Sequence, residues 1–68
     1  MRILYKSTIY ECNKCVLMKP NTLDFHIHGS NMIICVIFSC EEEAEMVFRN
    51  FLERGFYDAN GKDVLLLG

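Results

Sequence analysis

The longest apolar run in the chain covers residues 32–38, where seven consecutive side chains are hydrophobic. Successive side chains of a strand point to opposite faces of its sheet, so a strand with one face in water alternates instead. We therefore expect this segment to be a strand with apolar side chains on both faces. A helix can cover one of those faces, and the other needs separate cover.

Residues 22–28, directly before this run, alternate strictly between apolar and polar side chains. A period of two is typical of a strand with one buried face. The apolar side chains of that face are Leu23, Phe25 and Ile27. Residues 29–31 (Gly-Ser-Asn) then predict a three-residue loop and a hairpin with the apolar run. In the resulting register, Cys35 lies near Phe25.

The first part of the chain, residues 2–12, is rich in β-branched and aromatic side chains, which favour strands. The alternation slips at Ser7, which predicts a bulge there. Residues 13–14 (Asn-Lys) are expected to form a two-residue turn, because Asn tolerates positive φ, and residues 15–18 then return as a strand. Pro20 ends that strand because it has no N–H group for the ladder.

The most regular pattern in the chain predicts an amphipathic helix over residues 40–54. Ser39 is a good N-cap, and Glu42 three residues later completes a capping box. Gly55 is the expected residue after the last turn. Apolar side chains recur in one stripe along this helix: Ala44, Val47, Phe48, Phe51 and Leu52. A single stripe covers a single face of a sheet.

The end of the chain reads as a second hairpin. Residues 56–59 and 62–67 flank Asn60-Gly61, the strongest short signal for a type I′ turn. Together these elements predict one α+β domain over residues 1–68. It is an antiparallel sheet of four to five strands, in β-β-β-α-β-β order, with one amphipathic helix packed on one face.

Composition narrows the class of protein further. The chain has 68 residues, of which 51% are hydrophobic, and a net charge of −2. A chain this short buries only about 60% of its unfolded surface, so small proteins often rely on oligomerisation. The seven Lys and Arg residues are scattered, which disfavours direct contact with nucleic acid. The size is typical of small proteins from phages and mobile elements.

The sequence also predicts a compartment. No segment approaches the roughly 20 apolar residues of a membrane span, and the first residues lack the apolar stretch of a signal peptide. We therefore expect an intracellular, cytoplasmic protein that does not contact a membrane and keeps its four cysteines reduced.

The pair Cys12 and Cys15 has the spacing of a zinc knuckle or of a redox motif. Cys35 and Cys40 are the only other thiols, and the predicted register places both too far from the first pair to share a metal. We therefore expect no cofactor. A zinc- or thiol-dependent protein that uses Cys12 and Cys15 is the alternative function. No serine stands in a pattern with a matched histidine and acid, so an enzyme is not expected.

The apolar run carries the main functional prediction. The helix covers one set of its side chains, so the other set needs a partner, and closed two-fold dimers are the commonest oligomers. The set that we assign to partner binding is Met32, Ile34, Val36 and Phe38, and the alternative set is Ile33, Cys35 and Ile37. The expected function is a non-catalytic protein-interaction module, a small regulatory or inhibitory protein that forms a homodimer.

Acidic residues at the start of the helix are a second candidate surface. Glu41, Glu42 and Glu45 form a patch that suits a basic protein partner. Glutamates in the first turn also stabilise a helix by interacting with the positive end of its dipole. Both interpretations stand at the level of sequence.

Overall fold

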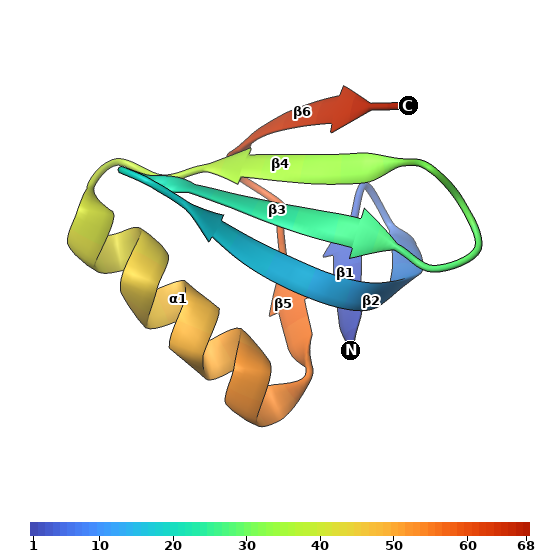
Figure 1. Cartoon of the computed structure of the whole chain (residues 1–68), viewed down its shortest axis with the longest axis horizontal. Helices are drawn as coiled ribbons and strands as arrows, with labels where there is room; N and C mark the ends of the chain where they lie inside the picture. The colour runs from blue at the N-terminus through green and yellow to red at the C-terminus, as the bar shows by residue number, and fades with distance from the viewer.

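Six strands and one helix make up the structure, a computed structural model that describes residues 1–68 (Figure 1). The elements are β1 (Arg2–Tyr5), β2 (Thr8–Met18), β3 (Thr22–Ile27), β4 (Ile33–Ile37), α1 (Glu41–Arg54), β5 (Phe56–Asp58) and β6 (Asp63–Leu67). The strands form one sheet in the order β5-β1-β2-β3-β4-β6. The predicted α+β class with one helix is confirmed, but the sheet has six strands rather than four or five.

A tight turn at Lys6-Ser7 divides the first predicted strand into β1 and β2. Both residues have positive φ, 48° and 64°. Positive φ at both central residues is typical of a type I′ hairpin turn. The turn predicted at residues 13–14 is wrong: these residues lie inside β2, where the pairing with β3 shifts between Cys12 and Lys14. The irregularity is a bulge, and it follows the hairpin instead of preceding it.

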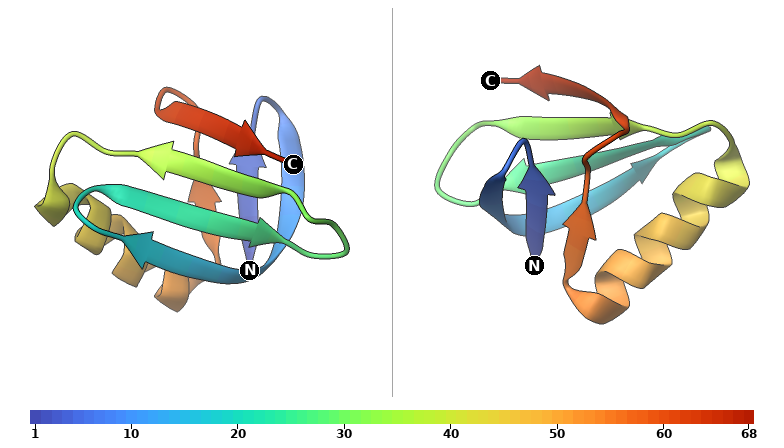
Figure 2. Two further views of the ribbon diagram at one scale, coloured as in Figure 1. Left: turned by 45° about the horizontal axis from the view of Figure 1, so that its top comes forward. Right: turned by 180° about the vertical axis from the view of Figure 1, so that it is seen from behind.

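Strand β2 is long enough to pair with two neighbours along its length. Its first part pairs antiparallel with β1, and its second part pairs antiparallel with β3. In Figure 2 the sheet curls around this strand, so that β1 and β5 stand across the ends of the other strands. The curl gives the sheet an inner side, which α1 covers, and an opposite side, which α1 does not reach (Figure 1).

The hairpin predicted around Asn60-Gly61 does not form. Strands β5 and β6 lie at opposite edges of the sheet, because β5 pairs parallel with β1 and β6 pairs antiparallel with β4. Only residues 59–62 join the two strands (Figure 2). Gly61 has φ of 82°, whereas Asn60 does not have positive φ, so the pair is not a type I′ turn.

Strands β3 and β4 pair in a register that differs by one residue from the predicted register. The connection between them covers residues 28–32, and Phe25 lies opposite Ile34 rather than Cys35. A shift of one residue moves every side chain of a strand to the other face. Ile34 and Val36 therefore point to the inner side, and Cys35 points to the opposite side.

The core lies between α1 and the inner side of the sheet. Its largest fully buried side chains are Phe25, Phe51, Ile3, Leu23, Ile34 and Val36. The ring of Phe25 meets Phe51 of α1 edge to face at 5.0 Å and stacks on Tyr57 of β5 at 5.7 Å. Such aromatic pairs contribute about 0.5–1.5 kcal/mol beyond the area that they bury. They fix the helix and β5 to the middle of the sheet.

The helix matches its prediction closely, except at its first residue. It begins at Glu41 with Cys40 as N-cap, one residue later than expected, and Cys40 makes no side-chain capping bond. Gly55 ends it with φ of 72°, and its N–H group donates to the carbonyl of Phe51 at 2.7 Å. Leu52, which was expected in the core, is exposed at the end of the apolar stripe. The helix is too short and too polar to cross a membrane.

Candidate functional site: the uncovered face of the sheet

The side of the sheet that α1 leaves uncovered is the main candidate site, and we call it the outer face. The pairing registers place three rows of side chains on it, across β2, β3, β4 and β6. The apolar members are Val16, Met18, Ile33, Cys35, Ile37, Leu65 and Leu67. The polar members are Lys14, Thr22, Asp24, His26 and Asp63.

Apolar side chains dominate one half of the outer face. All of its members on β4 and β6 are apolar except Asp63, whereas all of its members on β3 are polar. Ile37, Leu65 and Leu67 are exposed there, and Met18 is exposed at the end of β2. Contiguous apolar surface on a small protein marks an interaction site more often than scattered apolar residues do.

Cys35 lies at the centre of this face, between Asp24 of β3 and Leu65 of β6. It is only 7% exposed, so it is a packed thiol, as expected from the sequence, but on the outer face. Burial, followed by a hydrogen bond with Asp24, raises the pKa of the Cys35 thiol to about 11. The thiol therefore stays protonated at neutral pH and acts as a packing group.

The residues first assigned to partner binding lie elsewhere. Ile34, Val36 and Phe38 are buried in the chain's own core, so they offer no surface to a partner. Met32 is half-buried and packs against the edge of that core. The one-residue shift in register explains the correction, because it exchanges the two sets of β4 side chains between the faces. The alternative set, with Ile33 and Ile37, is the one on the uncovered side.

The acidic residues lie on α1, across the sheet from the outer face (Figure 1). Lys19 forms ion pairs with Glu45 at 3.2 Å and with Glu41 at 3.6 Å. A hydrogen bond with Glu45 is the main reason why the pKa of Lys19 is raised. Glu42 has no ion pair. The patch is thus smaller and less negative than its sequence suggests.

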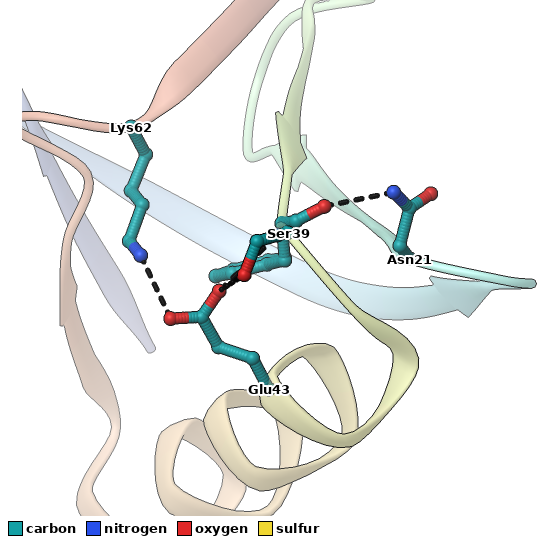
Figure 3. Close-up of polar contacts among 5 residues, drawn as sticks. Asn21, Ser39, Glu43 and Lys62 are labelled. Atoms are coloured by element: carbon teal, nitrogen blue, oxygen red, sulfur yellow. Dashed lines mark hydrogen bonds and ion pairs between the residues drawn. The ribbon is translucent and has the colours of Figure 1, made fainter.

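Glu43 acts as a connector between three elements (Figure 3). Its Oε1 accepts hydrogen bonds from the Ser39 hydroxyl at 3.1 Å and from the Ser39 N–H group at 3.3 Å. Its Oε2 pairs with Lys62, directly before β6, at 2.9 Å. Lys62 also lies over the ring of Phe38 at 5.5 Å. The start of β6 is therefore fixed to the start of the helix.

Cys12 and Cys15 lie on one strand and not across a turn, which corrects the predicted geometry. Both point into the core, opposite Ile27 and Phe25 respectively. Burial raises the pKa of Cys12 to about 11 and that of Cys15 to about 12. Zinc binding and thiol chemistry both require the thiolate, which this environment disfavours. The structure contains no group of three or more His, Cys, Asp or Glu side chains placed to hold a metal ion.

An open hollow of about 560 Å³ lies at one end of the outer face. It brings together Lys14 and His26 with Asn31 and Met32 of the loop between β3 and β4. No carboxylate or thiol lines it, so His26 has no acidic side chain there to pair with for acid–base chemistry. The hollow extends the outer face as a recess beside the loop between β3 and β4.

Sequence reasoning missed the contribution of β6 to the outer face. The sequence placed Leu65, Leu66 and Leu67 in a local hairpin, in which residues 56–59 would pair with one edge of their strand. The signal was present, because a run of three leucines has apolar side chains on both faces, like residues 32–38.

Comparisons of the chain with protein-family models, with curated proteins and with solved structures find no match.

Proposed function

We propose that the chain is a non-catalytic protein-interaction module, a small regulatory or inhibitory protein that works as a homodimer. The observation that supports this function is the outer face, where apolar side chains from three strands stay exposed on the side opposite the helix. A protein partner with an apolar surface of similar size is the occupant that this face suits best.

Charges at the corners of the outer face favour one orientation of that partner. Lys14 stands at one corner, on β2, and Asp63 stands at the opposite corner, on β6. A partner with an acidic group near Lys14 and a basic group near Asp63 binds without leaving either charge unpaired. Charges at the rim of an interface mainly set the orientation and the rate of association.

Because the chain is small, a stable interface with a partner takes up a whole face of the molecule. A stable interface buries about 800 Å² on each partner. The accessible surface of this chain is 4270 Å², so such an interface takes about a fifth of it. No hollow on the molecule offers that area, whereas a sheet face four strands wide does.

Ile37→Lys tests this proposal, because Ile37 is 41% exposed on the apolar half of the outer face, at the end of β4 opposite Asp63. Met46→Lys is the matched control, since Met46 is 53% exposed on the helix. Immobilised wild-type protein and Met46→Lys should capture the same partner from native cells, and Ile37→Lys should not. Circular dichroism checks that each variant is folded.

Equal capture by Ile37→Lys would contradict docking on the outer face. Combined replacement of Glu41, Glu42 and Glu45 by lysine, in the same assay, tests the acidic patch as the contact surface. Loss of capture in that variant alone would move the docking site to the helix. Unchanged capture would exclude the acidic patch.

A further inference from the structure

Strand β6 forms an edge of the sheet, and its side chains are exposed on both faces. It pairs with β4 along one side and with no strand along the other. Leu65 and Leu67 point to the outer face, and Leu66 points to the inner side, opposite Ile34. Their exposed fractions are 54%, 45% and 44%, so neither the helix nor the rest of the sheet covers this strand.

The edge also lacks the features that keep strands from pairing between molecules. Natural edge strands are protected by lysines, prolines, bulges or very short length. Residues 63–67 contain none of these residues and no irregularity in register, and Asp63 at the start is their only charge. The opposite edge, β5, has only three residues. Residues 12–18 of β2 also have no neighbouring strand on the side away from β3, but Lys14 and the register shift between Cys12 and Lys14 protect that edge. Strand β6 is thus the unprotected edge of the sheet.

We propose that β6 pairs antiparallel with β6 of a second copy of this chain, about a two-fold axis perpendicular to the sheet. This inference deepens the proposed function and rests on its homodimer. A closed two-fold pairing uses up the only unprotected edge in both copies, so assembly stops at two chains.

Symmetry leaves few registers for this pairing. The axis keeps every side chain on its own face, so only residues that share a face can lie opposite one another. Centring the axis on Leu65 places Leu65 opposite its own copy, Val64 opposite the copy's Leu66, and Asp63 opposite the copy's Leu67. All five residues of the strand are then paired, and every pair except the terminal ones joins two apolar side chains.

Other registers are worse by the same criteria. Centring the axis on Asp63 sets two like charges directly opposite, which destabilises strand pairs. Centring it on Val64 or on Leu66 leaves two of the five residues without a partner in the copy's strand, and centring it on Leu67 leaves four. In the favoured register the two Asp63 residues lie about 13 Å apart along the strands, beyond the roughly 8–10 Å over which salt screens charges.

The same axis has a consequence for partner binding. A rotation about an axis perpendicular to the sheet leaves both outer faces on one side of the dimer. Two docking surfaces then face in the same direction, next to each other. A partner with two matching sites, or a symmetric partner, binds such a dimer more tightly than either face alone would allow.

Sedimentation of the full chain tests the pairing and keeps it separate from partner docking. The wild type, Ile37→Lys and Met46→Lys should sediment as dimers, whereas Leu66→Lys should sediment as a folded monomer. Leu66 is not on the outer face, so Leu66→Lys should still capture the partner, although less tightly. A monomeric wild type would overturn the pairing. A dimer that Ile37→Lys breaks and Leu66→Lys spares would place the second copy on the outer face instead.

Disulfide cross-linking tests the register directly. The background carries Cys35→Ala and Cys40→Ser, because Cys35 lies opposite Leu65 within the chain and Cys40 is exposed. In that background Leu65→Cys should form a covalent dimer under oxidised glutathione. Leu66→Cys should not, because the two copies of residue 66 are roughly 8 Å apart, too far for a disulfide. A covalent dimer of Leu66→Cys without one of Leu65→Cys would overturn the register, and failure of both would overturn the pairing.

Discussion

Tyr57 has a well-packed ring and a hydroxyl group that has no partner. The ring stacks on Phe25 and lies against Phe38 at 6.1 Å. The hydroxyl oxygen is inaccessible to solvent and makes no hydrogen bond. A buried polar group without a partner costs about 1–3 kcal/mol of stability. At this position the ring contributes to stability and the oxygen reduces it.

Replacing Tyr57 by Phe should therefore leave the free energy of unfolding unchanged or raise it by about 1 kcal/mol. Tyr57→Leu, the control, removes the stacked ring and should lower the free energy of unfolding by at least about 1 kcal/mol. Urea denaturation at pH 7 measures both. A clear loss of stability in Tyr57→Phe would mean that the hydroxyl group has a partner, such as an ordered water.

The buried thiols predict how stability depends on alkaline pH. Burial raises the pKa of Cys12 to about 11, that of Cys15 to about 12 and that of Cys35 to about 11, from an ordinary value of 9.0. The folded protein thus binds protons that the unfolded chain releases first. The stabilisation is complete below about pH 9 and is lost as the pH rises towards 11–12, by up to about 1.4 kcal/mol per pH unit for each thiol.

Urea denaturation between pH 8 and pH 11 should show this loss, and Cys35→Ala should make it shallower. A free energy of unfolding that stays constant over that range would show that the thiols titrate normally.

At the residue scale, the sequence predicted which side chains of β3 are buried but not which side chains of β4 are. Leu23, Phe25 and Ile27 alternate with polar residues, so only one orientation buries them. The run 32–38 is apolar on both sides, so its pattern does not select a register. The loop between β3 and β4 sets the register of the two strands, and a hydrogen bond from the Met32 N–H group to the Ser30 hydroxyl helps to hold that loop.

At the scale of elements, Glu43 shows how one side chain can join a helix, a strand end and a turn. It accepts hydrogen bonds from Ser39 and pairs with Lys62 (Figure 3). The hydrogen bond from Lys62 is the main cause of the lowered pKa of Glu43. A lowered pKa means that the stabilisation is present at neutral pH and is lost as the pH falls through the folded pKa.

Glu43→Gln should therefore lower the melting temperature at pH 7, since the amide keeps an acceptor oxygen but loses the charge. The difference from wild type should vanish in acid, where Glu43 is protonated in both the folded and the unfolded chain. Glu42→Gln is the control for loss of a charge in the first turn, because Glu42 has no ion pair, and it should lower the melting temperature less than Glu43→Gln does. Thermal melts monitored by circular dichroism at several pH values measure the effect.

The turns were the least predictable elements. Lys6-Ser7 adopts positive φ at both residues although neither is glycine or asparagine, so its sequence carries no turn signal. Asn60-Gly61 carries the signal without forming the hairpin. Its asparagine instead makes local bonds: its N–H group donates to Asp58 at 2.9 Å, and its side chain accepts from the Lys6 N–H group at 3.2 Å. The helix was predictable because its apolar stripe and its terminal glycine, Gly55, both indicate a helix that ends at residue 54.

At the scale of the whole molecule, the fold class followed from the sequence, but the order of the strands did not. Every predicted pairing was between neighbours in the chain, whereas β5 pairs with β1, at the other end of the chain. Such a long-range pairing leaves no local pattern in the residues. The outer face includes β6, which lies beside β4 at the edge of the sheet opposite to β5. The long-range pairing of β5 with β1 therefore accompanies the formation of this face.

The connection at residues 59–62 also constrains how the protein folds during synthesis. Strands β1 to β4 can pair as soon as they are made, because each is next to its partner in the chain. Until residues 56–67 follow, β1 and β4 each keep one edge without a neighbouring strand. Contacts of high sequence separation form slowly, and unpaired strands promote aggregation. Residues 56–67 thus close two distant edges of the sheet, because β5 pairs with β1 and β6 pairs with β4.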